Sequence, residues 1–108
     1  MAAQLIHFAS LTWNHIANGA REKRIESPTF IFRLVEFSPG FIEDEWCPKA
    51  HFGYVVSGKF AISFRDETVQ YQQGDGICIN AGRESEHKAV VTEVVELFLV
   101  EPISRNEG

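Results

Sequence analysis

Short runs of apolar residues, divided by turn-forming sequences, make up most of this chain. The clearest run is 29–37 (TFIFRLVEF), which is rich in aromatic and β-branched residues and ends at the turn sequence Ser38-Pro39-Gly40. Such composition and spacing are typical of β-strands. Further runs of this kind follow at 51–56, 60–64, 69–72, 77–79, 87–91 and 94–100. The pattern predicts an all-β fold, an antiparallel sandwich or barrel with little helix.

Two of these runs make more specific predictions. Residues 51–56 and 60–64 flank Ser57-Gly58-Lys59, and we expect them to form a hairpin. Residues 29–37 are apolar on both faces apart from Arg33 and Glu36. A strand of this kind is covered on both sides, by the barrel interior on one and by something outside it, such as a second subunit, on the other. We therefore expect a homodimer.

The N-terminal part, residues 1–27, lacks the regular series of apolar runs found in the rest of the chain. Residues 4–8 predict a short edge strand, and 11–18 predict one or two helical turns that end at Asn18-Gly19. The basic run 21–24 is interrupted by Glu22, and we interpret it as a solvated face. We expect one domain over 1–108, with a barrel core over about 28–101, the N-terminal strand and helical turn in 1–27, and a tail at 102–108.

Composition narrows the function classes. A chain of 108 residues is large enough for one core, and a net charge of -5 argues against a nucleic-acid partner. No apolar run approaches the length that spans a bilayer, so we expect no membrane partner and a cytoplasmic location. A reducing compartment would keep both cysteines as thiols, with a Cys47–Cys78 bridge as the alternative.

Candidate chemistry gathers between Glu45 and His87, which holds two of the four histidines and both cysteines. In a strand, side chains two apart share a face, so Glu45, Cys47 and His51 project to one side if the chain stays extended through Pro48. Gly53 follows on the same face, where it would leave open space for a cavity. A carboxylate, a thiolate and an imidazole would then converge.

The same stretch resembles a known family. The sequence H-x-G-Y-V-V-S-G ends at Gly58, and G-D-G-I-C-I-N-A-G begins at Gly74 and is followed by His87. These are similar to the two motifs of the cupin superfamily, which are small double-stranded antiparallel β-helices, or jelly-roll barrels, that bind one metal ion through four side chains. Where the second motif of the family has Pro-x-Gly, this chain has Asn80-Ala81-Gly82.

The resemblance implies a ligand set. With Gly58 as the anchor of the first motif, His51 takes the place of the family's glutamate, and Cys47 and Glu45 take the places of its two histidines. His87 is the candidate histidine of the second motif. It comes two residues later than in the family, and an insertion of two preserves strand parity. The implied metal ligands are therefore His51, His87, Cys47 and Glu45.

This donor set suits a divalent metal ion. Zn²⁺ accepts N, S and O donors and fits best, with Ni²⁺, Fe²⁺ or Mn²⁺ as alternatives. Glu45 and Glu86 are the candidate catalytic proton carriers, and Glu84 is a further one. The structural alternatives are hydrogen-bonded barrel histidines, a buried Cys47 and a solvated Glu45. Cys78, between Ile77 and Ile79, is interpreted as a core residue.

Three functions from different classes remain. The first is a metal-dependent enzyme that acts on a small polar or acidic metabolite. The second is a non-catalytic module that binds or senses a small molecule, and the third is a dimeric scaffold. The sequence shows no hydrolase signature, phosphate-binding loop or CxxC motif, and cupins of similar fold carry out different reactions.

Overall fold

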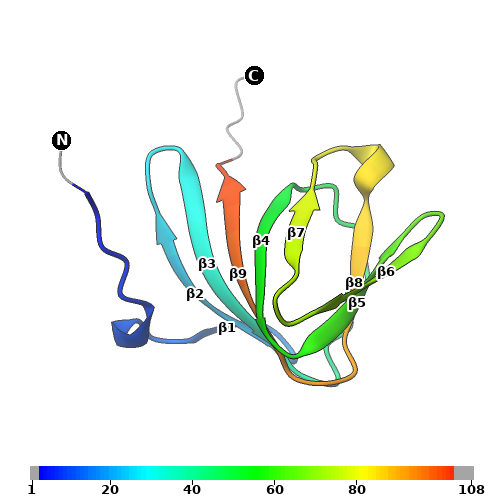
Figure 1. Cartoon of the computed structure of the whole chain (residues 1–108), viewed down its shortest axis with the longest axis horizontal. Helices are drawn as coiled ribbons and strands as arrows, with labels where there is room; N and C mark the ends of the chain where they lie inside the picture. Colours follow the sequence, from blue (N-terminus) through cyan, green and yellow to red (C-terminus); the bar gives the residue numbers. More distant parts are fainter. Residues whose placement is uncertain (1–2, 104–108) are drawn as a thin grey trace.

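Two antiparallel sheets pack around a shared apolar interior (Figure 1). The computed structural model describes residues 3–103. One sheet has the strand order β1-β2-β3-β9-β4-β7 and the other the order β6-β5-β8. The strands are β1 (Asn14–Ala17), β2 (Ala20–Glu26), β3 (Phe30–Phe37), β4 (His51–Ser57), β5 (Lys59–Phe64), β6 (Thr68–Gln72), β7 (Gly76–Ile79), β8 (His87–Val90) and β9 (Val95–Pro102), with 3-10 turns η1 (Phe8–Ser10) and η2 (Arg83–Ser85). The predicted all-β fold is confirmed.

The alternation of side chains along each strand builds the core. In β9 every second residue, including Val95, Leu97 and Leu99, is buried between the sheets. Burying one side chain of this size stabilises the fold by about 1.5–3 kcal/mol. The core cluster consists of Val35, Val55, Phe60, Ile62, Ile77, Ile79, Val91, Val95, Leu97 and Leu99. Within residues 3–103, no helix is long and apolar enough to cross a membrane.

The outer face of the six-stranded sheet is covered in part by the chain's own N-terminal segment. Phe8 packs edge-on against Phe98 of β9, with ring centroids 6.0 Å apart. Nζ of Lys23 donates a hydrogen bond of 2.9 Å to the carbonyl oxygen of Phe8. The apolar residues on both faces of β3 led us to expect that its outer face is covered. These contacts of the N-terminal segment provide part of that cover. Phe30, at one end of that strand, stays exposed.

The predicted hairpin is wrong. β4 pairs with β7 and β9, whereas β5 pairs with β6 and β8, so the two strands belong to different sheets. Gly58 lies at the corner between them with a φ of 81°, and a Cβ there would lie 2.3 Å from the carbonyl oxygen of Val94. The same turn chemistry suits a hairpin and a sharp corner between sheets, and local sequence does not distinguish the two.

The predictions for the N-terminal part are also corrected. Residues 4–8 form no strand, and Asn14–Ala17 form the edge strand β1 in place of a helical turn. The basic run lies within β2, where Glu22 and Lys23 are buried. Pairing with β3 overrides the local preference, because β3 supplies neighbours that the local sequence cannot show. Of the tail predicted at 102–108, Pro102 belongs to β9, and 104–108 lie outside the described residues.

Candidate metal centre

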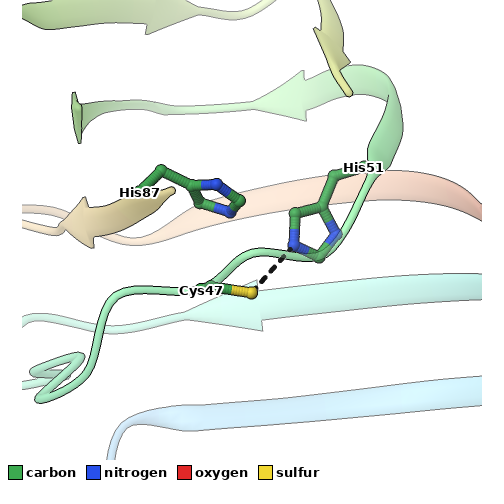
Figure 2. A group of neighbouring side chains, drawn as sticks. All are labelled: Cys47, His51 and His87. Atoms are coloured by element: carbon green, nitrogen blue, oxygen red, sulfur yellow. Dashed lines mark hydrogen bonds between the residues drawn. The ribbon is translucent and has the colours of Figure 1, made fainter. Parts of the chain in front are cut away.

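Three predicted ligands meet between the two sheets. The ligand atoms of Cys47, His51 and His87 all lie within 4.8 Å of one another (Figure 2). Sγ of Cys47 is 3.6 Å from Nε2 of His51, and the two imidazole centroids are 4.9 Å apart. His51 begins β4 in the larger sheet and His87 begins β8 in the smaller one. The centre therefore joins the two sheets.

Cys47 comes from an irregular segment, residues 41–50, which we call the strap. The strap runs along β8: the Cys47 amide donates to the His87 carbonyl at 2.8 Å, and the His87 amide donates to the Cys47 carbonyl at 3.1 Å. Oε1 of Glu43 accepts a hydrogen bond of 2.6 Å from the Ala89 amide. Backbone groups on an edge strand need such partners. The strap thus holds Cys47 directly beside His87.

Trp46 adds a second attachment of the strap. The guanidinium of Arg65 lies 4.1 Å from the centroid of the Trp46 ring, and the ammonium of Lys88 lies 5.1 Å from it. Cations over an indole face are attracted by its negative quadrupole. Arg65 in turn pairs with Glu86 at 3.2 Å. This aromatic contact links the strap to β8 and to the end of β5 in the smaller sheet.

Each histidine has an acceptor at Nδ1. His51 donates Nδ1–H to the Glu101 carboxylate, and His87 donates Nδ1–H to the carbonyl oxygen of Ser85 at 3.0 Å. A hydrogen bond at one ring nitrogen fixes the tautomer and leaves the other nitrogen free to bind. Nε2 is therefore the ring atom that each histidine offers to the group that Cys47 completes, and in the metal-free protein Nε2 of His51 contacts the Cys47 sulfur. Such carboxylate or carbonyl support is typical of histidines that ligate metals.

Glu101 belongs to a row of charges that crosses the inner face of the larger sheet. Nη1 of Arg33 lies 2.9 Å from the Glu101 carboxylate, and Nε of Arg33 lies 2.7 Å from Glu22. The side chains of Glu22, Arg33 and Glu101 are each no more than 15% exposed. Buried charges need opposite charges and hydrogen bonds as partners. The row, from Glu22 through Arg33 and Glu101 to His51, satisfies that need and orients His51.

The neighbours of each group shift its pKa. Hydrogen bonds from His51 and then His87 lower the pKa of Cys47 to about 6. Burial opposes the charged form of His51, but Cys47 and Glu101 outweigh it and raise the pKa of His51 to about 9. Burial likewise opposes ionised Glu101, but His51 and Arg33 lower its pKa. Near pH 7 the metal-free protein therefore holds a Cys47 thiolate beside a His51 imidazolium.

Sequence reasoning placed some residues here that the structure places elsewhere. Glu45 is exposed on the strap and lies outside the Cys47, His51 and His87 group, because the strap is irregular and the alternation expected of a strand does not extend through it. Glu86 directs its carboxylate to Arg65, and Glu84 is exposed. No side-chain interaction with the group is found for these three carboxylates among residues 3–103.

Two further interpretations are corrected. Gly53 does not leave space for a cavity, since a Cβ there would lie 1.9 Å from the Phe98 carbonyl oxygen. The glycine serves the close approach of β4 and β9 instead. Cys78 is exposed, whereas its neighbours Ile77 and Ile79 are buried, so it is not a core residue. Both cysteines are free thiols, and the alternative disulfide is absent.

Glu101 is the residue of the site that sequence reasoning missed. It lies 50 residues after His51, and no motif includes it. One signal was present: Glu101 continues the buried series of Leu97 and Leu99 along β9, which places its carboxylate on the inner face. An acidic residue in phase with core leucines indicates a buried charge that requires a partner.

Comparison with known proteins agrees with this geometry. Residues 33–101 match the family model described as the cupin domain. The chain belongs to the cupin family. The match confirms the resemblance seen in the two motifs. None of the curated proteins compared with this cupin matches it.

Solved structures show the same fold. The polyketide cyclase RemF from Streptomyces resistomycificus is 19% identical, with a TM-score of 0.81 over 96% of this chain and 82% of that one. A sugar phosphate isomerase of the cupin superfamily from Silicibacter pomeroyi is 15% identical, with a TM-score of 0.76 over 94% and 76%. A cupin-2 domain protein from Shewanella frigidimarina is 25% identical, with a TM-score of 0.63 over 83% of each chain. At such identities these likenesses concern the fold and not the reaction.

Beside the three donors lies a cavity of about 230 Å³. Its wall draws on both sheets and on the strap, and most of its residues are apolar. Arg33, Glu43 and Lys49 are the other charged residues that line it. A small molecule in this cavity would lie against Cys47, His51 and His87.

Proposed function

We propose that this cupin binds one divalent metal ion through Cys47, His51 and His87 and uses it on a small molecule held in the cavity. The observation that carries the proposal is the pair of Nδ1–H hydrogen bonds, to Glu101 and Ser85, which leave Nε2 of both histidines beside a thiolate. Two imidazoles and a thiolate suit Zn²⁺ best, with Ni²⁺, Fe²⁺ or Mn²⁺ as alternatives. Three protein ligands leave one position open, as in catalytic zinc sites.

The spacing of the donors supports the fit. Nitrogen and sulfur donors of a tetrahedral zinc ion lie roughly 3.3–3.8 Å apart. The three ligand atoms here lie within 4.8 Å of one another, so each pair of ligand atoms needs to draw together by about 1.5 Å at most. The low pKa of Cys47 supports the same conclusion, because a metal ligand must be deprotonated.

The ion would polarise an oxygen of the ligand or activate a bound water. The chain's own residues have supporting roles. Glu101 keeps the proton of His51 on Nδ1, and Arg33 holds the Glu101 carboxylate in place. The apolar wall restricts water around the ligand. Glu45 and Glu86 stay proposed proton carriers, to be tested by Glu45→Gln and Glu86→Gln in any activity that is found.

A non-catalytic binding or sensing module is the second candidate. The observation that favours it is the cavity wall, which offers few polar groups to act on a bound molecule. A homodimer is also proposed, on the exposed aromatic side chains of Phe30 and Tyr54 in the larger sheet. Light scattering at micromolar concentration tests the dimer, and a monomer would contradict it.

Metal content measured by mass spectrometry on tag-free protein, purified without chelator or added metal, tests the proposal. We expect about one equivalent of one metal in the native protein and less than about a tenth in Cys47→Ser and His87→Ala. Cys78→Ser is the matched cysteine control, since Cys78 is exposed and free, and should keep its metal. Glu45→Gln shows whether Glu45 joins the ligands. Native protein without metal, even after incubation with zinc, would contradict the proposal.

A further inference from the structure

The cavity beside the metal centre differs sharply in polarity from the centre itself. We infer that it takes a compact monocarboxylate with an apolar, ring-sized body, and that it discriminates against sugars and other polyols. The inference rests on the proposed function for the contact between the carboxylate and the metal. The preference for an apolar body follows from the residues of the cavity wall alone and does not require the metal.

Ten of the sixteen wall residues are apolar. They are Ile16, Phe37, Phe41, Phe60, Ile62, Ile77, Ile79, Ala89, Leu97 and Leu99. Three are aromatic and adjoin one another: the Phe37 and Phe41 rings stack with centroids 4.5 Å apart, and Phe60 is 6.5 Å from Phe37. An aromatic and aliphatic surface of this kind suits a flat ring or a branched alkyl group.

The polar wall residues are mostly committed to protein partners. Arg33 binds Glu22 through Nε and Glu101 through Nη1. Glu43 accepts the Ala89 amide proton. Lys49 is the other charged wall residue besides the metal donors, and it is exposed. Within residues 3–103, the structure shows no side-chain hydrogen bond or ion pair for it. Hydroxyl groups spread along a ligand would lose water and find no replacement partners.

The volume limits the size of the ligand. A cavity of about 230 Å³ holds on the order of ten non-hydrogen atoms, since water occupies roughly 30 Å³ per molecule. One end of the ligand must meet the cation at Cys47, His51 and His87, and a carboxylate does so with oxygen donors. The rest must be apolar to match the wall. Single-ring aryl carboxylates meet all three conditions.

Isothermal titration of the zinc-loaded protein with benzoate and with erythronate tests this inference. Both are monocarboxylates with the same number of non-hydrogen atoms, so charge and atom count are matched. They differ in the body of the molecule, which is an apolar aromatic ring in benzoate and a chain with three hydroxyl groups in erythronate. We expect benzoate to bind at least about tenfold more tightly. Equal affinity, tighter binding of erythronate, or no binding of benzoate at millimolar concentration would overturn the inference.

A wall variant locates the effect. Phe41→Ser replaces one aromatic wall residue of the strap that is not a metal donor, and should weaken benzoate binding about tenfold while metal content stays unchanged. Phe41→Leu keeps the wall apolar and should lose less benzoate affinity. It replaces the serine variant in this test if that variant does not fold. Phe30→Ser is the matched control, because Phe30 is exposed and does not line the cavity. Unchanged benzoate affinity in Phe41→Ser would contradict the assignment of the wall.

Metal analysis of the same samples separates this inference from the proposed function. A protein that holds no metal but still prefers benzoate contradicts the metal proposal and supports the apolar wall. A metal-loaded protein that prefers erythronate overturns the inference about the ligand and leaves the metal proposal standing.

Discussion

His51 and Cys47 reach the same centre from two different kinds of backbone. His51 lies on β4, which is paired with β7 and β9, and its imidazole ends a row of buried charges. Cys47 lies on the strap, which has no extended strand of its own and is held to β8 by two isolated backbone bridges, Ile42 to Val90 and Cys47 to His87, and by a few side chains. One ligand is positioned by the core of the barrel and the other by attachments at its edge.

This difference predicts two kinds of failure. Damage to the support of His51 leaves charges buried without partners and lowers the stability of the whole fold. Damage to the support of Cys47 loosens a peripheral segment, which opens locally with little effect on global unfolding. Substitutions in the two regions therefore test whether the centre has a rigid half, which is His51 and its buried charges, and an adjustable half, which is Cys47 and the strap.

The largest effect is expected for Arg33→Met. It leaves Glu22 and Glu101 buried without their cation and should lower the free energy of unfolding by about 3–5 kcal/mol. Urea unfolding measures the change. Arg21→Met is the control, because Arg21 pairs with Glu36 at a more exposed position and should cost less than about 1 kcal/mol. Equal losses would show that the row is no more important than a surface pair.

Glu101→Gln should act on metal binding. Losing the carboxylate at Nδ1 of His51 should weaken metal affinity by about 10–100-fold, as measured by competition with a chelator. The pKa of His51 in the metal-free protein, followed by NMR, should fall from about 9. Glu96→Gln, a partly buried acid on the same strand, should change neither quantity. Unchanged metal affinity would exclude Glu101 as the support of His51.

The pH dependence follows from Cys47 and His51. In metal-free Cys78→Ser protein, alkylation of Cys47 should rise with pH around a midpoint near 6. His51→Gln should move this midpoint upward, toward the ordinary thiol value. A midpoint near 9 in the parent protein would contradict the ion pair.

The same two groups set the pH range in which their ionisation stabilises the metal-free fold. The folded pKa of Cys47 is lowered, so its contribution is fully present above pH 9 and is lost as the pH falls through about 6. The folded pKa of His51 is raised, so its contribution is present below about pH 6.5 and is lost as the pH rises through about 9. Unfolding measured across this range checks both signs.

Glu43→Ala tests the adjustable half. It removes the acceptor of the Ala89 amide and should cost about 1–3 kcal/mol. Hydrogen exchange at Ala89 and alkylation of Cys47 should both become faster, because the strap opens more often. Asp44→Ala changes the exposed neighbour and serves as the control. An unchanged exchange rate would show that the strap does not depend on Glu43.

The smallest effect is expected for Glu86→Gln. Its partner Arg65 is largely exposed, so losing the ion pair should cost less than about 1 kcal/mol in urea unfolding. Metal content should stay unchanged, since Glu86 lies outside the donor group. Loss of metal in this variant would place Glu86 among the ligands.

The sequence by itself determined the strands from β3 to β9 and the family. Apolar runs and turn sequences are local features, so they predict strands without knowledge of their partners. Cys47, His51 and His87 were also found from the sequence, because they stand at positions related to the two cupin motifs. The strand β1 and the buried charges of β2 were missed, since their conformation depends on pairing with β3.

The tertiary structure alone decided how these parts come together. Glu101 meets His51 across 50 residues and Arg33 across 68, through the register of β3, β9 and β4. Glu45 lies apart from the centre because the strap bends where a strand was expected, and the corner at Gly58 sends β5 to the other sheet. Local patterns specify which face a side chain takes within a strand. Which strands lie side by side depends on contacts between residues far apart in the chain.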